Sequence, residues 1–325
     1  MPDEVFLTGA TGFVGGHVLG ALREAGYSVR ALVRGDPSRL PAGPGLRSVS
    51  GDVREAGRLV PAIRGCRYLV HVAAAYSFSP RDRGEMEAVN VLGTRSLLEA
   101  ARLAGVERAV VTSSVAAVGP IRGGRLATES DWAEATGHRG YHASKVRQER
   151  AALRANLPVV TVLPTAPIGP GDARPTPTGR MVLDVMLGRM PAYVDGAMNL
   201  VAVEDVGRAH VLALERGRPS RRYLVGGRNL SLAEVMAMIA QRAGVRAPAW
   251  RMPYAVALAA GWADELRCRM VPGARPRVPL EGVRMSRQRM LVRIDRARDE
   301  LGYRPSEVEG AVDRAIAWYR AHGCT

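Results

Sequence analysis

The 325-residue sequence predicts an α/β fold: a doubly wound parallel sheet, followed by a smaller α/β lobe toward the C-terminus. Two observations predict this class. Strand and helix signals alternate over the first half of the chain, as expected when helical crossovers join parallel strands. The chain also exceeds the roughly 250–300 residues at which single cores stop growing, so its length suits either one large α/β unit or a first domain followed by a smaller lobe.

The first half of the chain contains five segments rich in β-branched and aliphatic residues, which predict buried strands. These are Glu4–Thr8, Ser28–Val33, Arg67–Val72, Arg108–Thr112 and Leu157–Leu163. Helical stretches separate them, and the first is expected to end at Gly26. The helices cover Phe13–Ala25, Glu85–Ala104 and Tyr141–Asn156. Ligands of such folds bind at the carboxyl edge of the sheet.

The second half of the chain is less regular. Residues 164–179 read PTAPIGPGDARPTPTG, and their five prolines predict a loop without regular structure. Further along, Ser231 and Glu234 predict a capping box at the start of a helix. The predicted helices are Met181–Gly188, Glu204–Glu215 and Ser231–Ala243, and the predicted strands are Leu200–Val203 and Arg222–Val225.

The sequence lacks the signals of a membrane span, a metal centre or a disulfide framework. No stretch approaches the ~18 consecutive apolar residues of a membrane helix, and an export signal is missing, so we expect a cytoplasmic protein. Cys66, Cys268 and Cys324 are odd in number and far apart, and we expect no metal. The apolar run Tyr254–Ala263 predicts a buried helix, with contact to a membrane surface as the alternative.

The chain is strongly basic, with 46 Lys and Arg residues against 31 Asp and Glu. The arginines are scattered along the whole length, so we expect no nucleic-acid partner. Lys145 is the only lysine, a composition that coding bias toward arginine explains. The alternative is that some of the charge attracts an anionic substrate or a membrane surface.

A glycine-rich segment, TGATGFVG, follows the first predicted strand and opens the first predicted helix. Gly9, Gly12 and Gly15 allow a tight turn, close approach of a pyrophosphate, and close packing of helix on sheet. The helix N-terminus adds free N–H groups and a positive dipole end. This context predicts a dinucleotide site. The residues between the glycines complete the predicted contacts: Thr11, Phe13 and Val14.

The end of the second predicted strand bears on which dinucleotide binds. An acid there usually contacts the ribose hydroxyls, whereas an arginine suits the 2′-phosphate of NADP(H). The sequence VRALVRGD puts Arg34 near the strand end and Asp36 two residues later. We therefore expect NADP(H), and Asp36 keeps NAD(H) as the alternative.

The segment YHASK places Tyr141 and Lys145 four residues apart on a predicted helix, so their side chains share one face. A free phenol titrates near ~10, and a neighbouring ammonium together with an oxidised nicotinamide favours the phenolate. Arginine matches neither the pKa nor the shape of lysine. The pair therefore predicts a proton-handling site, with a surface Tyr–Lys pair as the alternative.

With these motifs the chain resembles the extended short-chain dehydrogenase/reductases, which share the G-x-x-G-x-x-G spacing of its glycine loop. The resemblance implies that Ser114 hydrogen-bonds the substrate oxygen, with Ser113 as the fallback. His71 is expected to be a satisfied strand-end histidine. The resemblance also implies cofactor contacts at Tyr141 and at Lys145, which grips the cofactor ribose. Further implied contacts are Asp52 and Val53 in GDV, Ala73 and Ala74 in HVAA, Asn90 in AVNVLGT, Thr112 and Pro164.

The second half of the chain is similar to the hopanoid-associated sugar epimerase group, through VLPTAPIGPGDARPTPTGR, NLVAVEDVGRAHVLALERG and RYLVGGRNLSL. The resemblance implies a Rossmann-type NAD(P)-binding domain over 1–165, with contributions from about 198–225, and a substrate-binding lobe over 166–325. A homodimer is implied, because helices 85–104 and 141–156 form a four-helix interface in many relatives. The implied substrate contacts beside Ser114 are Tyr76, Ala166, Arg180 and Tyr193.

The resemblance implies hydride transfer at a carbinol/ketone carbon, in a sugar epimerase of hopanoid-type lipid metabolism. The alternative is an NADPH-dependent ketone reductase of the dihydroflavonol-reductase or 3β-hydroxysteroid-dehydrogenase type, whose second strand also ends in VR. A third hypothesis is a catalytically silent NADP-sensing regulator. Such regulators typically lose the tyrosine or the lysine, and this chain keeps Tyr141 and Lys145.

Overall fold

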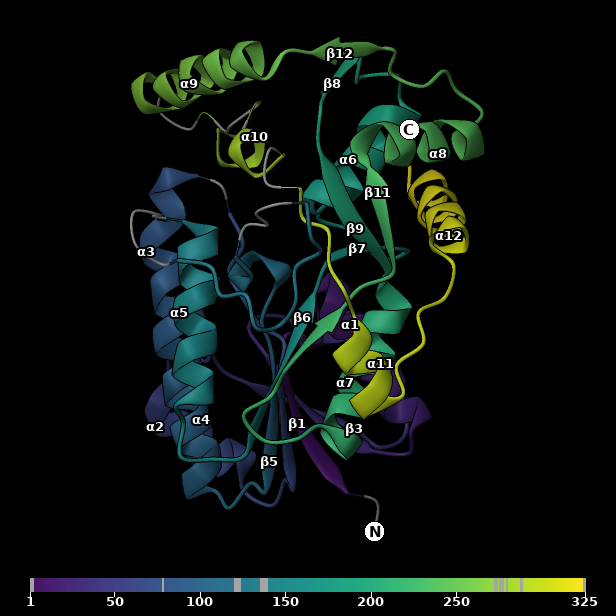
Figure 1. Ribbon diagram of the computed structural model, residues 1–325. Helices are drawn as coiled ribbons and strands as arrows, with labels where there is room; N and C mark the ends of the chain where they lie inside the picture. Colours follow the sequence, from purple (N-terminus) through teal and green to yellow (C-terminus); the bar gives the residue numbers. More distant parts are fainter. Residues whose placement is uncertain are drawn as a thin grey trace.

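A computed structural model of the chain describes residues 3–77, 79–119, 124–134, 140–271, 274, 278, 280–286 and 289–323. A seven-stranded sheet forms its centre, in the order β10-β6-β5-β4-β1-β2-β3, and every pairing is parallel (Figure 1). The strands are β1 (Glu4–Thr8), β2 (Ser28–Val33), β3 (Leu46–Ser50), β4 (Tyr68–His71), β5 (Arg108–Thr112), β6 (Val159–Pro164) and β10 (Arg222–Val225). The predicted doubly wound parallel sheet is confirmed.

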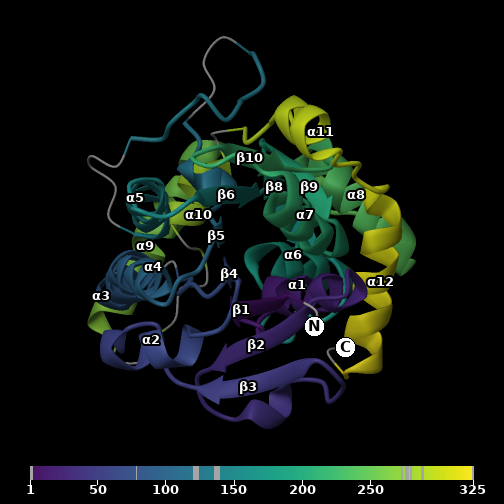
Figure 2. The same ribbon diagram turned by 90° about the horizontal axis from the view of Figure 1, so that it is seen from below.

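Helices cover both faces of this sheet (Figure 2). One face carries α1 (Phe13–Glu24), α7 (Val203–Arg216) and α11 (Asp295–Leu301). The other face carries α2 (Ala56–Ile63), α4 (Thr94–Leu103) and α5 (Tyr141–Leu153). Because all seven strands run parallel, the segments that follow them meet at one carboxyl edge.

A second lobe packs beyond this carboxyl edge (Figure 1). Its sheet has the order β11-β9-β7, and it shares one apolar core with three helices. Ser231 caps α8 through the predicted capping box with Glu234. The elements are β7 (Ala166–Ile168), α6 (Pro177–Met186), β9 (Ala197–Ala202), β11 (Arg228–Ser231), α8 (Leu232–Ala243) and α12 (Val308–Ala321), beside a two-stranded ribbon of β8 (Ala192–Val194) and β12 (Trp250–Met252).

The prediction that residues 164–179 lack regular structure is wrong, because β7 and the start of α6 lie there. β7 is an edge strand, and an edge tolerates Pro167 because no N–H is needed on the open side. Pro177 occupies the first turn of α6, where its missing N–H would have no helical partner, and Thr176 caps the helix. Proline count alone therefore underestimates the order of this segment.

The prediction that the apolar run Tyr254–Ala263 is a buried helix is wrong. It belongs to the longer helix α9 (Tyr254–Met270), whose buried residues form one stripe: Ala257, Gly261, Asp264 and Cys268. The stripe consists mostly of small residues, and a Cβ added at Gly261 would lie 3.2 Å from the Leu280 Cα of α10 (Leu280–Ser286). The helix therefore approaches its neighbour through its small side, and its large apolar side chains face solvent.

Among the helices in the described ranges, none is long and apolar enough to cross a membrane.

Candidate active site

The turn between β1 and α1 leaves no room for a side chain at Gly9 or Gly15. Gly9 has a φ of 81°, and a Cβ there would lie 2.6 Å from the backbone nitrogen of Ala73. A Cβ at Gly15 would lie 1.9 Å from the carbonyl oxygen of Gly9. Gly12 precedes α1 and donates its N–H to that same oxygen at 3.0 Å. The turn is thus a backbone cradle at a helix N-terminus, which fits the diphosphate of a dinucleotide.

Arg34 lies directly after β2, with 64% of its side chain exposed. Its guanidinium is 3.8 Å from the Asp52 carboxylate and 3.7 Å from that of Glu85. Asp36 instead caps a short turn, where it accepts the Ser38 N–H at 2.8 Å. The end of β2 therefore offers the exposed guanidinium of Arg34, whereas the carboxylate of Asp36 is already hydrogen-bonded to the backbone of Ser38.

Tyr141 and Lys145 lie one turn apart at the start of α5. The Tyr141 ring is half-buried and meets the Tyr76 ring edge to face, with 4.3 Å between the centroids. Lys145 is 2% exposed, and its Nζ donates to the backbone oxygen of Thr112 at 2.9 Å and to Gln148 Oε1 at 2.6 Å. Because Thr112 ends β5, the pair lies at the carboxyl edge of the sheet.

Burial lowers the pKa of Lys145 to about 7, and the charge of Glu149 opposes the shift. A lysine in water titrates near ~10.4. The Lys145 ammonium therefore gives up its proton more readily than a lysine ammonium in water. A perturbed pKa next to a tyrosine at a ligand-binding edge is typical of a functional site.

A chain of buried hydrogen bonds continues from Lys145 toward β1. Gln148 Nε2 donates to Thr94 Oγ1 at 3.1 Å, and Thr94 Oγ1 is 2.8 Å from His71 Nε2. His71 Nδ1 is 2.7 Å from Thr8 Oγ1. Burial, with a contribution from the Lys145 charge, lowers the pKa of His71 to about 3. His71 is thus a neutral, fully hydrogen-bonded strand-end histidine that ties the lysine to the strand preceding the glycine loop.

Asn90 lies in a π-helical segment, η3 (Glu87–Gly93), between α3 (Arg83–Met86) and α4. Its side chain accepts the Ala75 N–H at 2.7 Å and donates to the Ala75 carbonyl at 2.9 Å and to Ser144 Oγ at 3.1 Å. π-Helical turns are frequent at functional sites. Here the turn lets one amide clamp the segment after β4 to the first turns of α5.

The two serines after β5 differ in their surroundings. Ser113 is buried and donates to Glu149 Oε2 at 3.0 Å. Ser114 is half-buried and accepts the Ala116 N–H at 3.1 Å. Glu149 also forms a buried ion pair with Arg222, at 2.9 Å. Ser113 therefore belongs to an interior network, and Ser114 is the serine with an open side.

The other predicted cofactor residues lie in the glycine loop, in the first turn of α1, or at the ends of strands and in the segments that follow them. These are Thr11, Phe13, Val14, Val53, Ala73, Ala74, Thr112 and Pro164. These residues come from five separate sequence segments, and the structure places them along one edge of the sheet.

The predicted substrate residues are less concentrated. Tyr76 is 44% exposed and contacts Tyr141. The other three lie in the second lobe: Ala166 begins β7, Tyr193 lies in β8, and Arg180 in α6 is paired with Asp184 at 3.2 Å. Tyr76 is therefore the one that the structure brings to the Tyr–Lys pair.

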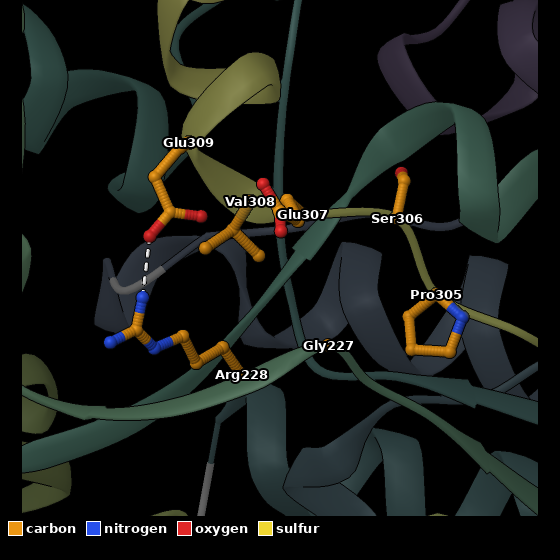
Figure 3. Close-up of a pocket in the computed structure, with 7 residues that line it drawn as sticks. All are labelled: Gly227, Arg228, Pro305, Ser306, Glu307, Val308 and Glu309. Carbon is orange, nitrogen blue, oxygen red and sulfur yellow. Dashed lines mark hydrogen bonds and ion pairs between the residues drawn. The ribbon is translucent and has the colours of Figure 1, made fainter.

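A separate hollow lies where α12 begins, and no predicted site residue lines it (Figure 3). Arg228 donates to Glu309 at 2.5 Å across its rim. The lining residues are Gly227, Arg228, Pro305, Ser306, Glu307, Val308 and Glu309. The hollow is therefore distinct from the glycine loop and the Tyr–Lys pair.

Within the described ranges, no group of three or more His, Cys, Asp or Glu side chains is arranged to hold a metal ion. Cys66 and Cys268 are buried free thiols. Cys324 lies outside the described residues.

A glycine cradle after the first strand of a parallel sheet is typical of dinucleotide-binding α/β enzymes, and the Tyr141–Lys145 pair lies at the same carboxyl edge. The chain matches the model of the NAD dependent epimerase/dehydratase family over residues 5–226. It belongs to that family and is an NAD(P)-dependent enzyme of the extended short-chain type.

Two similar sequences and one solved structure extend the comparison. A "Putative dihydroflavonol 4-reductase" of Synechocystis is 40% identical, over 99% of this chain and 96% of the relative. Sterol demethylase protein B of Methylococcus capsulatus is 35% identical over 98% of both chains. A nucleoside-diphosphate-sugar epimerase from Pseudomonas aeruginosa is 26% identical over 99% of both chains, with a TM-score of 0.82.

Three members of the buried network were not predicted from the sequence: Thr94, Ser144 and Gln148. The available signal was polar residues at several positions of α5 that the structure buries, including Lys145 and Glu149. An inward helix face is normally apolar. Ser144 and Gln148 follow Tyr141 and Lys145 by three residues, so helical spacing was the available signal for these two. Thr94 comes from another helix, and only the fold brings it to Gln148.

Proposed function

We propose that the protein transfers a hydride between NADP(H) and a carbinol/ketone carbon, with Tyr141 giving or taking the hydroxyl proton. The observation that carries the proposal is Lys145: a buried lysine, one turn from a tyrosine, held against the end of β5. The bound nicotinamide would supply or accept the hydride. Tyr141 would hold the proton at its phenol oxygen, and Lys145 would stabilise the phenolate when that proton leaves.

The remaining residues bind and orient. Ser114 is proposed to hydrogen-bond the substrate oxygen, because Ser113 is already turned toward Glu149. The backbone of the glycine loop would hold the diphosphate. Arg34 is proposed to contact the 2′-phosphate of NADP(H), since its guanidinium is exposed, while the carboxylate that would favour NAD(H), Asp36, caps a turn.

We favour a hydrophobic ketone as the substrate, reduced in one direction. The relatives that cover nearly the whole chain at 40% and 35% identity are named as a dihydroflavonol reductase and a sterol demethylase protein, and both names refer to polycyclic molecules. A sugar epimerase of hopanoid-type lipid metabolism is the second candidate, supported by the family description and by the sugar-epimerase neighbour. A homodimer through α4 and α5 remains a prediction from the resemblance.

Following nicotinamide absorbance separates the two candidates. The purified chain is incubated with NADPH and either polycyclic ketones or nucleotide sugars. A reductase oxidises NADPH in step with loss of the ketone. An epimerase keeps its cofactor and converts one sugar epimer into the other without net change in absorbance. Failure to bind either dinucleotide would exclude both candidates.

A further inference from the structure

Helix α9 presents its large apolar side chains to solvent. Val256, Trp262, Leu266 and Met270 are between 51% and 68% exposed, and we call these four the α9 face. Trp250, in the strand just before the helix, is 78% exposed. Exposed single residues are ordinary, but several large ones along one helix indicate a surface that is covered by something else.

The surroundings of the α9 face are basic. Residues 250–289 contain eight arginines and three acids. Among the described ones, Arg251, Arg269, Arg284 and Arg289 are exposed. Arg269 pairs with Glu265, and Arg251 and Arg289 share Asp195, so the described acids offset only part of this positive charge. The Arg284 guanidinium lies 5.3 Å from the centre of the Trp262 ring, so positive charge borders the apolar side chains directly.

We propose that the α9 face docks on an anionic lipid bilayer. A helix that lies in the interface buries its apolar residues at the boundary of headgroups and acyl chains, and basic residues beside it attract anionic headgroups. The amphipathic indole of Trp262 suits that boundary. The helix would lie on the membrane surface and would not cross it. Among the described helices, α9 included, none is long and apolar enough to span a bilayer.

A second copy of the chain fits this surface less well. A two-fold contact would bring the same patch of each copy together, so the arginines around one α9 face would meet their own counterparts. Like charges held across an interface oppose association. An anionic bilayer supplies the opposite charge together with an apolar interior.

Docking would bring the proposed active site next to the membrane. Arg81, in the segment after β4, donates to the Cys268 carbonyl in α9 at 2.7 Å. The same segment carries Tyr76, whose ring packs on Tyr141. A hydrophobic ketone dissolved in the bilayer would thus lie beside this segment. That consequence rests on the function proposed above, whereas the docking itself does not.

Vesicle flotation of the full chain, without substrate or cofactor, tests the docking. We expect the protein to float with vesicles of phosphatidylglycerol mixed with phosphatidylcholine, to bind phosphatidylcholine alone weakly, and to lose most of its binding in high salt. Leu266→Glu, with Trp262→Gln as a second variant, should lower partitioning by at least about tenfold, because both remove apolar contact. Since both side chains are exposed, their melting temperatures should match the wild type.

Ala25→Glu is the control for the added charge, because Ala25 is exposed at the end of α1, outside both α9 and the predicted dimer helices. The proposal would be overturned if the wild-type protein floated with neither kind of vesicle, or if the Leu266→Glu variant floated as well as the wild type. A dimer that forms without lipid and dissociates in Leu266→Glu would assign the face to a second copy instead. An inactive enzyme that still floats would count against the proposed function alone.

Discussion

The active-site edge of the sheet and the α9 face depart from ordinary burial in opposite directions. The first buries a lysine, a glutamate–arginine pair and two histidines, whereas the second exposes tryptophan, leucine, valine and methionine. His71, Lys145 and the Glu149–Arg222 pair each have hydrogen-bond partners, so their burial is tolerated. The contrast teaches that polar groups are buried where chemistry is expected, and apolar ones are exposed where docking is expected.

The largest expected effect tests the edge itself. Tyr141→Phe should lower kcat by about 10²–10⁴-fold, because it removes the proposed proton donor. Binding of NADP(H) and the melting temperature should change little, since the ring remains. Steady-state kinetics and dinucleotide titration measure this, with Tyr27→Phe as a control remote from Lys145. Activity within a few-fold of the wild type would show that the proton takes another route.

The buried ion pair supplies the next effect. Arg222 is 4% exposed and also donates to the carbonyls of Glu129 and Ala117. Arg222→Ala should lower the free energy of unfolding by about 3–5 kcal/mol, because Glu149 keeps a buried, unpaired charge. Urea denaturation is the measurement. Arg102→Ala removes the exposed ion pair with Glu99 and should lower the free energy of unfolding by about 0–1 kcal/mol. Equal losses in the two variants would contradict the expectation that burial makes the Arg222–Glu149 pair more important.

Truncating one leucine in the central sheet and one in α9 compares how much each side chain contributes to stability. Leu69 is 0% exposed in β4, and Leu266 is 55% exposed in α9. Leu69→Ala should cost about 2–5 kcal/mol through lost burial and a cavity. Leu266→Ala should stay within about 0.5 kcal/mol. The same urea series decides, and a large loss at Leu266 would mean that α9 packs inside the folded chain.

Acid should destabilise the polar edge. His210 lies in α7 and is fully buried, with its Nε2 2.7 Å from Thr112 Oγ1 at the end of β5. Burial lowers the pKa of His71 to about 3 and of His210 to about 4, against 6.5 in the unfolded chain. Their contribution to stability is complete above pH 6.5 and is lost as pH falls toward 4, because the unfolded state alone takes up protons. Between its two pKa values, each histidine should change the free energy of unfolding by about 1.4 kcal/mol per pH unit. His210→Gln should remove one such slope in denaturation series from pH 7 to 5, and an unchanged slope would refute this.

The smallest expected effect concerns cofactor choice. Arg34→Ser should weaken NADP(H) relative to NAD(H) by about tenfold, since one exposed, charge-assisted contact is lost. The ratio of the two dissociation constants is the readout. Arg58→Ser, an exposed arginine of α2 paired with Glu55, should leave the ratio unchanged. If Arg34→Ser also leaves it unchanged, another group reads the 2′-phosphate.

Much of the sheet was predictable from sequence. The predicted bounds of β1, β2, β5 and β10 match the structure residue for residue, because runs of β-branched and aliphatic residues specify buried parallel strands locally. β7 was missed because its proline is tolerated only through its place at a sheet edge. The exposure of the apolar side chains of α9 was not predicted, because an apolar helix is expected to be buried unless the elements that pack against it are known.

The same division holds within the candidate site. Sequence alone determined the glycine loop and the Tyr141–Lys145 pair, because their function depends on spacing over a few residues within one turn or helix. Only the tertiary structure decided the lowered pKa of Lys145, the Asn90 clamp on Ala75, and which serine after β5 stays open. Burial and hydrogen-bond partners come from segments far apart in the chain, so no local pattern carries them.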